Sequence, residues 1–236
     1  MKLVFGRLDA TLAASRFIFA KLRAIGLTNV TYLPLGVDAT MFSPARKDES
    51  FRRGLGVKGV DKLLLFAGRY RVDKGVELLL SALPQILDDP NLHVAFAGAG
   101  PLENRVSRWS SRHGRVHDLG FVGDKALLAK AYASADGFLS PGHQETFGFG
   151  ICEALASGIP VLSADAGAGA EMISRFGSGL LFKAGDASDL ARGARTLARS
   201  DFGARIGAAR EALETRHNWD RILGTYVDHH ESLNGK

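Results

Sequence analysis

The stretch that decides the fold reads DKLLLFAGRYRVDKGVELLLSALPQIL and covers residues 61–87. Its continuous apolar run at residues 61–67 predicts a strand that is buried on both faces, as strands of a parallel sheet are. Gly68 ends this strand, and apolar residues then recur at helical spacing over residues 74–87, with Pro84 expected to perturb the helix near its end. A buried strand followed by a helix is the repeating unit of a parallel α/β sheet.

Strands and helices alternate in the same way along the rest of the chain. Working outward, we expect strands at residues 92–97, 116–121, 137–140, 160–164 and 179–182, and helices at residues 101–112, 125–134, 148–156 and from about 186 to the C-terminus. This order predicts an α/β fold with a doubly wound parallel sheet and right-handed crossovers. In such a sheet ligands bind beyond the carboxyl ends of the strands, so a site is expected in the loops that follow them.

The first part of the chain has a different pattern. It predicts one strand after Leu8, a helix at residues 15–25 that Gly26 ends, and a second strand at residues 30–33. A single βαβ unit cannot cover both faces of its own sheet. This segment is therefore expected to be either the end of another domain or an edge of the main one.

Composition excludes several classes of protein. With 46% hydrophobic and 23% charged residues, the chain is neither wholly disordered nor an integral membrane protein. Its single cysteine, Cys152, permits no internal disulfide and no cysteine-based zinc site, which favours a reducing, cytoplasmic compartment. Arg7 and Asp9 come too early for a signal peptide. The net charge of +5 suits a phosphate-bearing partner, but no nucleic acid is expected because basic and acidic residues alternate.

The loop GRYRVDKG at residues 68–75 leaves the first buried strand and enters a helix. It places Arg69 and Lys74 near a helix start, where cations oppose the helix dipole unless a bound anion meets them. A phosphate is such an anion, because helix amides and two cations can bind it together. A solvated loop with scattered charge explains the same residues equally well.

The loop GAGP at residues 98–101 follows the next strand. Gly98 and Gly100 would let the backbone approach a nucleotide, although a plain tight turn is the better explanation of this loop taken alone. The third glycine of a dinucleotide fingerprint is missing, because Glu103 stands there. This departure argues against an NAD-dependent dehydrogenase.

The most informative stretch reads HQETFGFGICEALASGIPV and covers residues 143–161. Glu145 lies in a loop after a strand, and Glu153 falls more than one turn into the following helix, so both carboxylates can face one cleft. Carboxylate oxygens accept hydrogen bonds from sugar hydroxyls and ribose diols, and the amides at the helix start can donate to phosphate. The alternative is that Glu145 is a loop charge and Glu153 an ordinary exposed helix residue.

Two further features have simpler explanations. Glu171 lies near a helix start after a loop of small residues, and helix capping accounts for it. His113 and His117 are four residues apart, but Gly114 lies between them and no HExxH motif is present, so no metal site is expected.

Taken together, these residues resemble the C-terminal, donor-binding half of a GT-B-fold retaining glycosyltransferase of family 4, also described as glycosyl transferases group 1. The resemblance covers about residues 63–226 and is strongest from Glu145 to Glu153, with the two glycine-rich loops in the family's order and spacing. An early segment that includes residues 30–38 also matches, except that Leu35 stands where the family usually has Asn.

The resemblance implies a division of the chain into four parts. These are a remnant of the N-terminal acceptor domain at residues 1–40, a linker at 41–60, a Rossmann-like nucleotide-sugar-binding domain at 61–215 and a C-terminal crossover helix at 216–236. The helix carries Trp219, Ile222 and Tyr226, and it would cover the remnant or remain partly exposed.

The resemblance also implies a role for each site residue. Arg69 and Lys74 would bind the donor diphosphate and Glu145 the transferred sugar, which makes these three the catalytic residues. Glu153 would hold the ribose diol. The other donor-binding residues would be Gly68, Gly98, Gly100, Phe121, Val122, Thr146, Phe147, Gly148 and Phe149, the last four through their backbone amides. No metal and no cofactor are expected, because the two cations and a helix end would take the place of a metal.

The implied reaction is retaining transfer of a hexosyl group from a UDP- or GDP-sugar to a glycan or lipid-linked acceptor. The alternative is a nucleotide-sugar-binding module, or a truncated fragment, without turnover of its own, because most of the acceptor-binding domain is absent. A separate or missing N-terminal domain would then complete the site. The resemblance is compatible with a cytoplasmic protein and allows peripheral contact with the inner face of the membrane.

Overall fold

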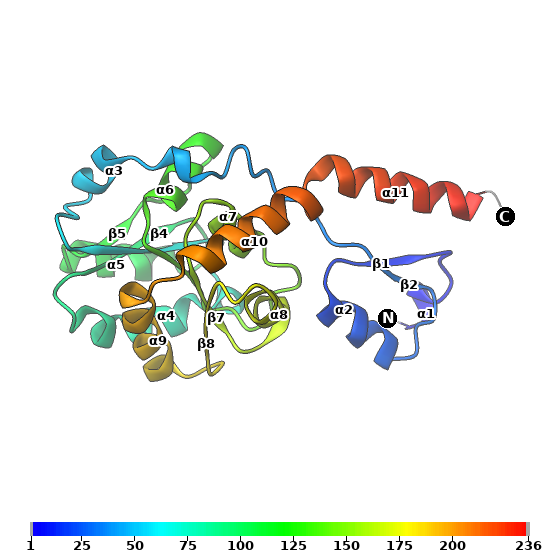
Figure 1. Ribbon diagram of the computed structural model, residues 1–236. Coiled ribbons are helices and arrows are strands. Elements are labelled where there is room, and N and C mark those ends of the chain that lie inside the picture. Colours follow the sequence, from blue (N-terminus) through cyan, green and yellow to red (C-terminus); the bar gives the residue numbers. More distant parts are fainter. Residues whose placement is uncertain (1, 235–236) are drawn as a thin grey trace.

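The computed structural model describes residues 2–234, so Met1, Gly235 and Lys236, which fall within the ranges 1–40 and 216–236, lie outside the described residues. Figure 1 shows a large α/β domain, a small amino-terminal lobe beside it and a long C-terminal helix that extends from the domain along the lobe. The large domain holds the main sheet, and the lobe holds the predicted βαβ unit.

A six-stranded sheet, parallel throughout, forms the centre of the large domain. In spatial order its strands are β5 (Val116–Asp118), β4 (Leu92–Ala97), β3 (Lys62–Ala67), β6 (Gly137–Ser140), β7 (Val161–Ala164) and β8 (Gly179–Phe182). The chain builds the sheet outward from β3 in one direction and from β6 in the other, so the switch point lies between β3 and β6. This order confirms the predicted doubly wound parallel sheet.

Helices cover both faces of the sheet, and this explains the continuous apolar run of β3. Leu64 and Phe66 pack with one layer of helices, and Leu63 and Leu65 pack with the other. The first layer consists of α4 (Val76–Leu87), α5 (Glu103–Arg112) and α9 (Ala187–Arg199). The second consists of α3 (Glu49–Gly54), α6 (Lys125–Ser134), α7 (Phe149–Ala156), α8 (Gly167–Phe176) and α10 (Gly203–Arg216).

The strand predicted at residues 116–121 is shorter in the structure. β5 ends at Asp118, whose carboxylate accepts hydrogen bonds from the amide of Gly120 (3.1 Å) and from the hydroxyl of Tyr70 (3.0 Å). An aspartate that bonds the backbone two residues further on stabilises a turn in place of an extended strand.

The helix predicted to begin at Lys74 begins two residues later. Val72–Lys74 forms a 3-10 turn, and Gly75 follows it with φ +71°, a conformation that glycine adopts at no steric cost. α4 then continues to Leu87 with Pro84 inside it. Lys74 therefore belongs to the turn before the helix and not to its first turn.

The stretch interpreted as a linker, residues 41–60, contains a 3-10 turn at Pro44–Arg46 and the helix α3. Arg52 of α3 is buried and donates hydrogen bonds to the carboxylate of Asp136 (2.7 Å) and to the carbonyl of Ser134 (2.8 Å). These bonds attach the stretch to the last residue of α6 and to the turn between α6 and β6.

The amino-terminal lobe has the predicted strand–helix–strand order. β1 (Thr11–Ala13) and β2 (Val30–Tyr32) pair in parallel, with α2 (Arg16–Ala24) between them and α1 (Lys2–Phe5), which the sequence did not predict, before them. Ser15 caps α2 by accepting a hydrogen bond from the amide of Ile18 (3.2 Å).

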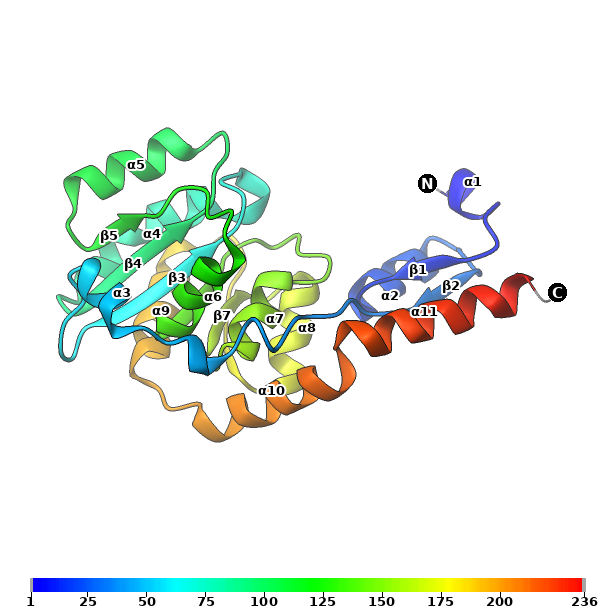
Figure 2. The same cartoon turned by 90° about the horizontal axis from the view of Figure 1, so that it is seen from above.

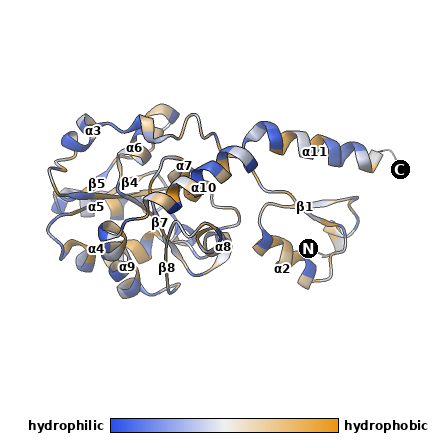
Figure 3. Cartoon of the chain, viewed as in Figure 1, coloured by the Kyte–Doolittle hydropathy of each residue, from blue (hydrophilic) through white to orange (hydrophobic). Residues whose placement is uncertain are grey.

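The C-terminal helix α11 (Trp219–Asn234) runs beside the lobe in both views (Figures 1 and 2). Ile222 is buried, whereas Trp219 and Tyr226 are 39% and 47% exposed, so the helix is only partly covered. Figure 3 shows hydrophobic residues along α11 as well as inside the large domain. Within residues 2–234, no helix combines the length and the apolar character needed to cross a bilayer.

Candidate active site

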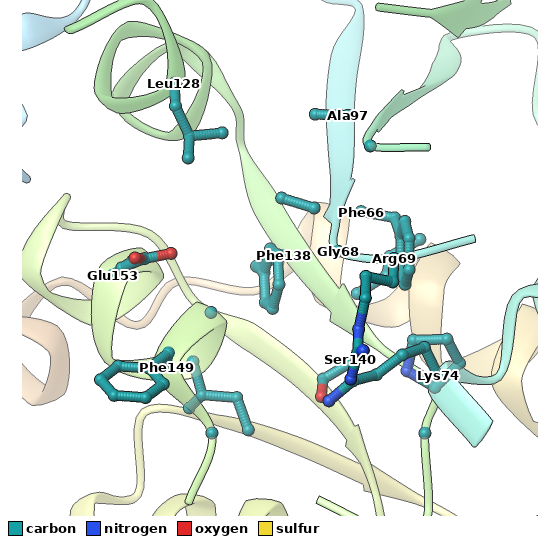
Figure 4. A pocket seen from close by; sticks show the side chains of 18 of the residues that line it. Phe66, Gly68, Arg69, Lys74, Ala97, Leu128, Phe138, Ser140, Phe149 and Glu153 are labelled. Atoms are coloured by element: carbon teal, nitrogen blue, oxygen red, sulfur yellow. The ribbon is translucent and has the colours of Figure 1, made fainter. Parts of the chain in front are cut away.

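A cavity of about 670 Å³ opens at the carboxyl ends of β3, β4 and β6, beside the switch point of the sheet (Figure 4). Parallel sheets bind ligands at this place. The predicted site residues that line it are Gly68, Arg69, Lys74, Gly98, Gly100, Phe121, Val122, Glu145, Gly148, Phe149 and Glu153. The structure thus brings together residues from four segments that are far apart in the sequence.

Two predicted donor-binding residues, Thr146 and Phe147, do not line this cavity. Thr146 is exposed to solvent, whereas Phe147 is 3% exposed. The ring of Phe147 packs edge-on against Phe149 (5.0 Å between centroids) and against the core of the large domain. The role that the resemblance implies for these two residues is a contact through their backbone amides, so it stays a prediction; the burial of Phe147 places a large apolar ring in the protein interior, where it is more stable than in water.

Lys74 and Glu145 come from different loops and form an ion pair, with 2.8 Å between Nζ and Oε2. Close packing of the two loop backbones brings them together, since a Cβ on Gly75 would lie 2.5 Å from the carbonyl carbon of Pro141. The side chains are 29% and 19% exposed, so water screens the pair only in part.

Arg69 is the second cation of the cavity. Figure 4 shows its guanidinium reaching into the cavity beside Ser140 and Lys74. The sequence analysis did not single out Ser140, although its position as the last residue of β6, at the edge where ligands bind, could have identified it.

The glycines of the GAGP loop allow the backbones of three loops to touch. A Cβ on Gly98 would lie 1.9 Å from the carbonyl oxygen of Gly68, and one on Gly100 would lie 2.8 Å from that of Tyr70. The amide of Gly98 also donates a hydrogen bond to the carbonyl of Gly120 (2.7 Å). Both glycines therefore shape one wall of the cavity through tight backbone packing.

Glu153 lies on α7 at the opposite end of the cavity from Arg69 and Lys74 (Figure 4). Burial raises the pKa of its carboxyl group to about 7, against the opposing effects of a hydrogen bond from Tyr132 and of the Lys125 charge. Glu153 is therefore not an ordinary exposed helix residue. Tyr132 is itself fully buried and lines the cavity, a role that its position within α6 did not reveal from the sequence.

Glu171 does not line the cavity. Its carboxylate accepts hydrogen bonds from the amides of Arg16 (3.3 Å) and Phe17 (2.9 Å), the first two residues of α2. Glu171 thus caps a helix, but the helix belongs to the amino-terminal lobe and not to its own segment.

His93, His113 and His117 do not line the cavity. Nε2 of His117 is 3.0 Å from Nδ1 of His93, and His113 stacks on Trp109 (4.6 Å between ring centroids). Over residues 2–234, no three His, Cys, Asp or Glu side chains cluster in a way that could hold a metal ion.

The family model described as "Glycosyl transferases group 1" matches residues 47–219. Sulfoquinovosyl transferase SQD2 of Arabidopsis thaliana is 34% identical over 89% of this chain and 42% of its own length. A GDP-mannose-dependent alpha-mannosyltransferase of Mycolicibacterium smegmatis is 32% identical over 98% of this chain and 59% of its own. The chain spans about half the length of the curated relatives it matches.

Solved structures share the fold over almost the whole chain. Sucrose-phosphate synthase of Thermosynechococcus elongatus has a TM-score of 0.84 at 23% identity and covers 99% of this chain and 60% of its own. HepE of Anabaena, solved with UDP and glucose, has a TM-score of 0.82 at 21% identity and covers 98% of this chain and 65% of its own. With the family match, the fold is that of the C-terminal part of a GT-B glycosyltransferase, and the chain belongs to the family of glycosyl transferases group 1.

Proposed function

We propose that this chain is the donor-binding part of a retaining glycosyltransferase that moves a hexosyl group from a UDP- or GDP-sugar to a glycan or lipid-linked acceptor. One observation carries the proposal. Two cations, Arg69 and Lys74, and two carboxylates, Glu145 and Glu153, line a single cavity at the switch point of the sheet. The volume of about 670 Å³ falls in the range of about 300–1,000 Å³ typical of small-molecule sites.

The cations would act on the diphosphate. Breaking the bond between sugar and phosphate leaves negative charge on the diphosphate, and cations held in place beforehand stabilise that charge. An ammonium group has three N–H donors, so Lys74 can hold Glu145 and donate to a phosphate oxygen at the same time. The fork of the Arg69 guanidinium suits a second pair of phosphate oxygens.

The carboxylates would bind hydroxyl groups at the two ends of the donor. Lys74 keeps Glu145 in place beside the phosphates, where its free lone pairs can accept from hydroxyls of the transferred sugar. Glu153, at the far end of the cavity, would accept from the two hydroxyls of the ribose. Retention by attack from the face of the leaving group would make Glu145 a positioning group for the sugar and not a nucleophile.

The base would lie by Phe121 and Val122, which line the cavity, and the ring of Phe121 is 79% exposed. Two donors deserve the first tests. The Anabaena structure with UDP and glucose supports a uridine donor, and the GDP-mannose-dependent relatives support a guanosine donor.

We also propose that transfer needs no metal ion, since Arg69 and Lys74 supply the positive charge that the diphosphate requires. A lipid-linked acceptor is supported by the name of a relative in Mycobacterium tuberculosis, a GDP-mannose-dependent phosphatidylinositol dimannoside mannosyltransferase. Such an acceptor would place the reaction at the cytoplasmic face of a membrane, with a separate N-terminal domain completing the site.

Calorimetric titration of the chain with UDP-glucose and GDP-mannose, together with a product assay, tests the proposal. We expect one of these donors to bind and Arg69→Ala to abolish most of the binding. Arg71→Ala is the matched control, because Arg71 lies in the same loop but pairs with Asp73 (2.8 Å) outside the cavity. If neither UDP-glucose nor GDP-mannose binds, the proposal is wrong, whereas binding without transfer would favour a binding module.

A further inference from the structure

Glu171 joins the amino-terminal lobe to the large domain. The hydroxyl of Ser15 accepts a hydrogen bond from the amide of Ile18, and the carboxylate of Glu171 accepts from the two amides before it, those of Arg16 and Phe17. The first turn of a helix leaves amides without partners inside the helix, and a carboxylate there also stabilises the helix dipole. The carboxylate that completes the first turn of α2 thus comes from α8, about 155 residues along the chain.

The helix that carries Glu171 also holds the backbone of Glu145. The amide of Ala168, in the first turn of α8, donates a hydrogen bond to the carbonyl of Glu145 (2.9 Å). Gly167 has φ +72°, and a Cβ on it would lie 2.9 Å from the same carbonyl oxygen. Glu145 therefore rests on the start of α8 with no space for a side chain between them.

The loop that carries Glu145 also reaches the junction with the lobe, through Phe147. A small cavity at the junction is lined by Phe147 and Glu171 together with Ala14, Ser15 and Tyr32 of the lobe. One side of the loop thus presents Glu145 to the large cavity, and the buried ring of Phe147 faces the junction with the lobe. A shift of the lobe can therefore be transmitted to Glu145 through two sets of packed residues, one that includes α8 and one that includes Phe147.

We propose that Glu171 is a positioning residue that couples the placement of the amino-terminal lobe to the position of Glu145 in the cavity. That Glu145 binds the donor rests on the proposed function, whereas the coupling between the lobe and the Glu145 loop does not depend on it. By linkage, a ligand that fixes Glu145 then also tightens the contact between Glu171 and α2.

Amide hydrogen exchange of the whole chain without ligand, followed residue by residue, tests the link. In Glu171→Ala we expect the amides of Arg16 and Phe17 to exchange about tenfold faster, as loss of a hydrogen bond to a charged group requires. We expect faster exchange at residues 143–149 as well. Glu171→Gln, which keeps one oxygen acceptor, should give an intermediate effect, and Glu211→Ala on the exposed side of α10 should give none.

Two results would overturn the proposal. One is faster exchange at Arg16 and Phe17 with residues 143–149 unchanged, because Glu171 would then be a helix cap only. The other is unchanged exchange at Arg16 and Phe17. If the far-ultraviolet circular dichroism shows that Glu171→Ala is unfolded, the same exchange comparison is made with Glu171→Gln.

A second measurement separates this link from the donor site. With UDP-glucose or GDP-mannose, whichever binds, we expect Glu171→Ala to weaken affinity about fivefold, the lower end of typical coupling between sites. In the unmodified chain the ligand should slow exchange at Arg16 and Phe17, and equal affinity without such slowing would contradict the coupling. If neither donor binds, the proposed function fails, while the exchange comparison without ligand still decides the role of Glu171.

Discussion

The ammonium of Lys74 and the carboxylate of Glu145 form an ion pair between the loop after β3 and the loop after β6, with 2.8 Å between Nζ and Oε2. The two loops flank the switch point of the sheet, so the pair spans the place where the strand order reverses. Under the proposed function, it keeps the phosphate-binding cation and the sugar-binding carboxylate at a constant separation.

Replacing Lys74 by Met should therefore weaken donor binding. The substitution removes a hydrogen bond to the diphosphate and leaves Glu145 partly buried without its partner. We expect the affinity for the nucleotide sugar to fall by on the order of tenfold or more, measured by calorimetry. Lys58→Met is the control, because Lys58 is exposed and does not line the cavity. Equal affinities for the two variants would remove Lys74 from the donor site.

The raised pKa of Glu153 predicts that donor binding depends on pH. The ionised carboxylate accepts hydrogen bonds from the ribose hydroxyls more strongly than the protonated group does, and with a pKa of about 7 a large share of the free protein carries a proton there at neutral pH. Affinity should rise as pH increases through about 7, because binding must release that proton below the pKa. Calorimetry in buffers of different ionisation enthalpy measures the proton release. In Glu153→Gln the pH dependence should disappear, and a pH profile unchanged by this substitution would contradict the ribose role.

Removal of divalent cations tests the proposed metal independence. If Arg69 and Lys74 supply the positive charge, chelation by EDTA should leave the affinity for the nucleotide sugar unchanged. A loss of binding that Mg²⁺ or Mn²⁺ restores would show that the donor binds as a metal complex.

Much of this site could be predicted from the sequence, because its signals are local. The buried run of β3 and the apolar spacing of α4 predict a parallel sheet, and the rule for such sheets identifies the loops that carry Arg69, Lys74 and Glu145. The spacing of apolar residues also predicts α6 and β8, and the predicted bounds agree with those in the structure.

The remaining features depend on contacts between distant segments. Glu171 caps α2, which lies far away in the sequence, so its own neighbours indicate only an ordinary cap. Phe147 lies in the same loop as Glu145, but its ring is buried at the junction with the lobe. Only the packed structure shows that this side of the loop is buried. Tyr132 reaches Glu153 from another helix, a contact that no local spacing predicts.

The stacked rings of His93, which is buried, and His117, which is half-buried, predict a loss of stability in acid. Burial lowers the pKa of both rings, and that of His117 to about 4. Asp61, which faces His93, opposes the shift, while Arg115 and Arg52 add to it. The unfolded chain therefore binds more protons than the folded one between about pH 4 and the usual histidine pKa, so stability falls as pH decreases through this window.

Thermal unfolding at pH 7 and at pH 5 measures this effect. His117→Asn should lose less stability between the two pH values than the unmodified chain, whereas the exposed His113→Asn should behave like the unmodified chain. Glu153 titrates in all three proteins, so its contribution cancels in the comparison. A drop of equal size in all three proteins would show that other groups cause the acid sensitivity.

Gly98 and Gly207 form a matched pair for testing the packing of the cavity wall. An alanine at residue 98 would place its Cβ 1.9 Å from the carbonyl oxygen of Gly68, so the two loops must separate. We expect Gly98→Ala to lower the free energy of unfolding by about 1–3 kcal/mol, as overpacking does, and to weaken donor binding. Gly207 lies in α10 with open space around it, and Gly207→Ala should raise the free energy of unfolding by about 0.5–1 kcal/mol, since alanine favours the helix. Denaturant unfolding gives both values, and a Gly98→Ala variant with unchanged stability and affinity would contradict the close contact between these loops.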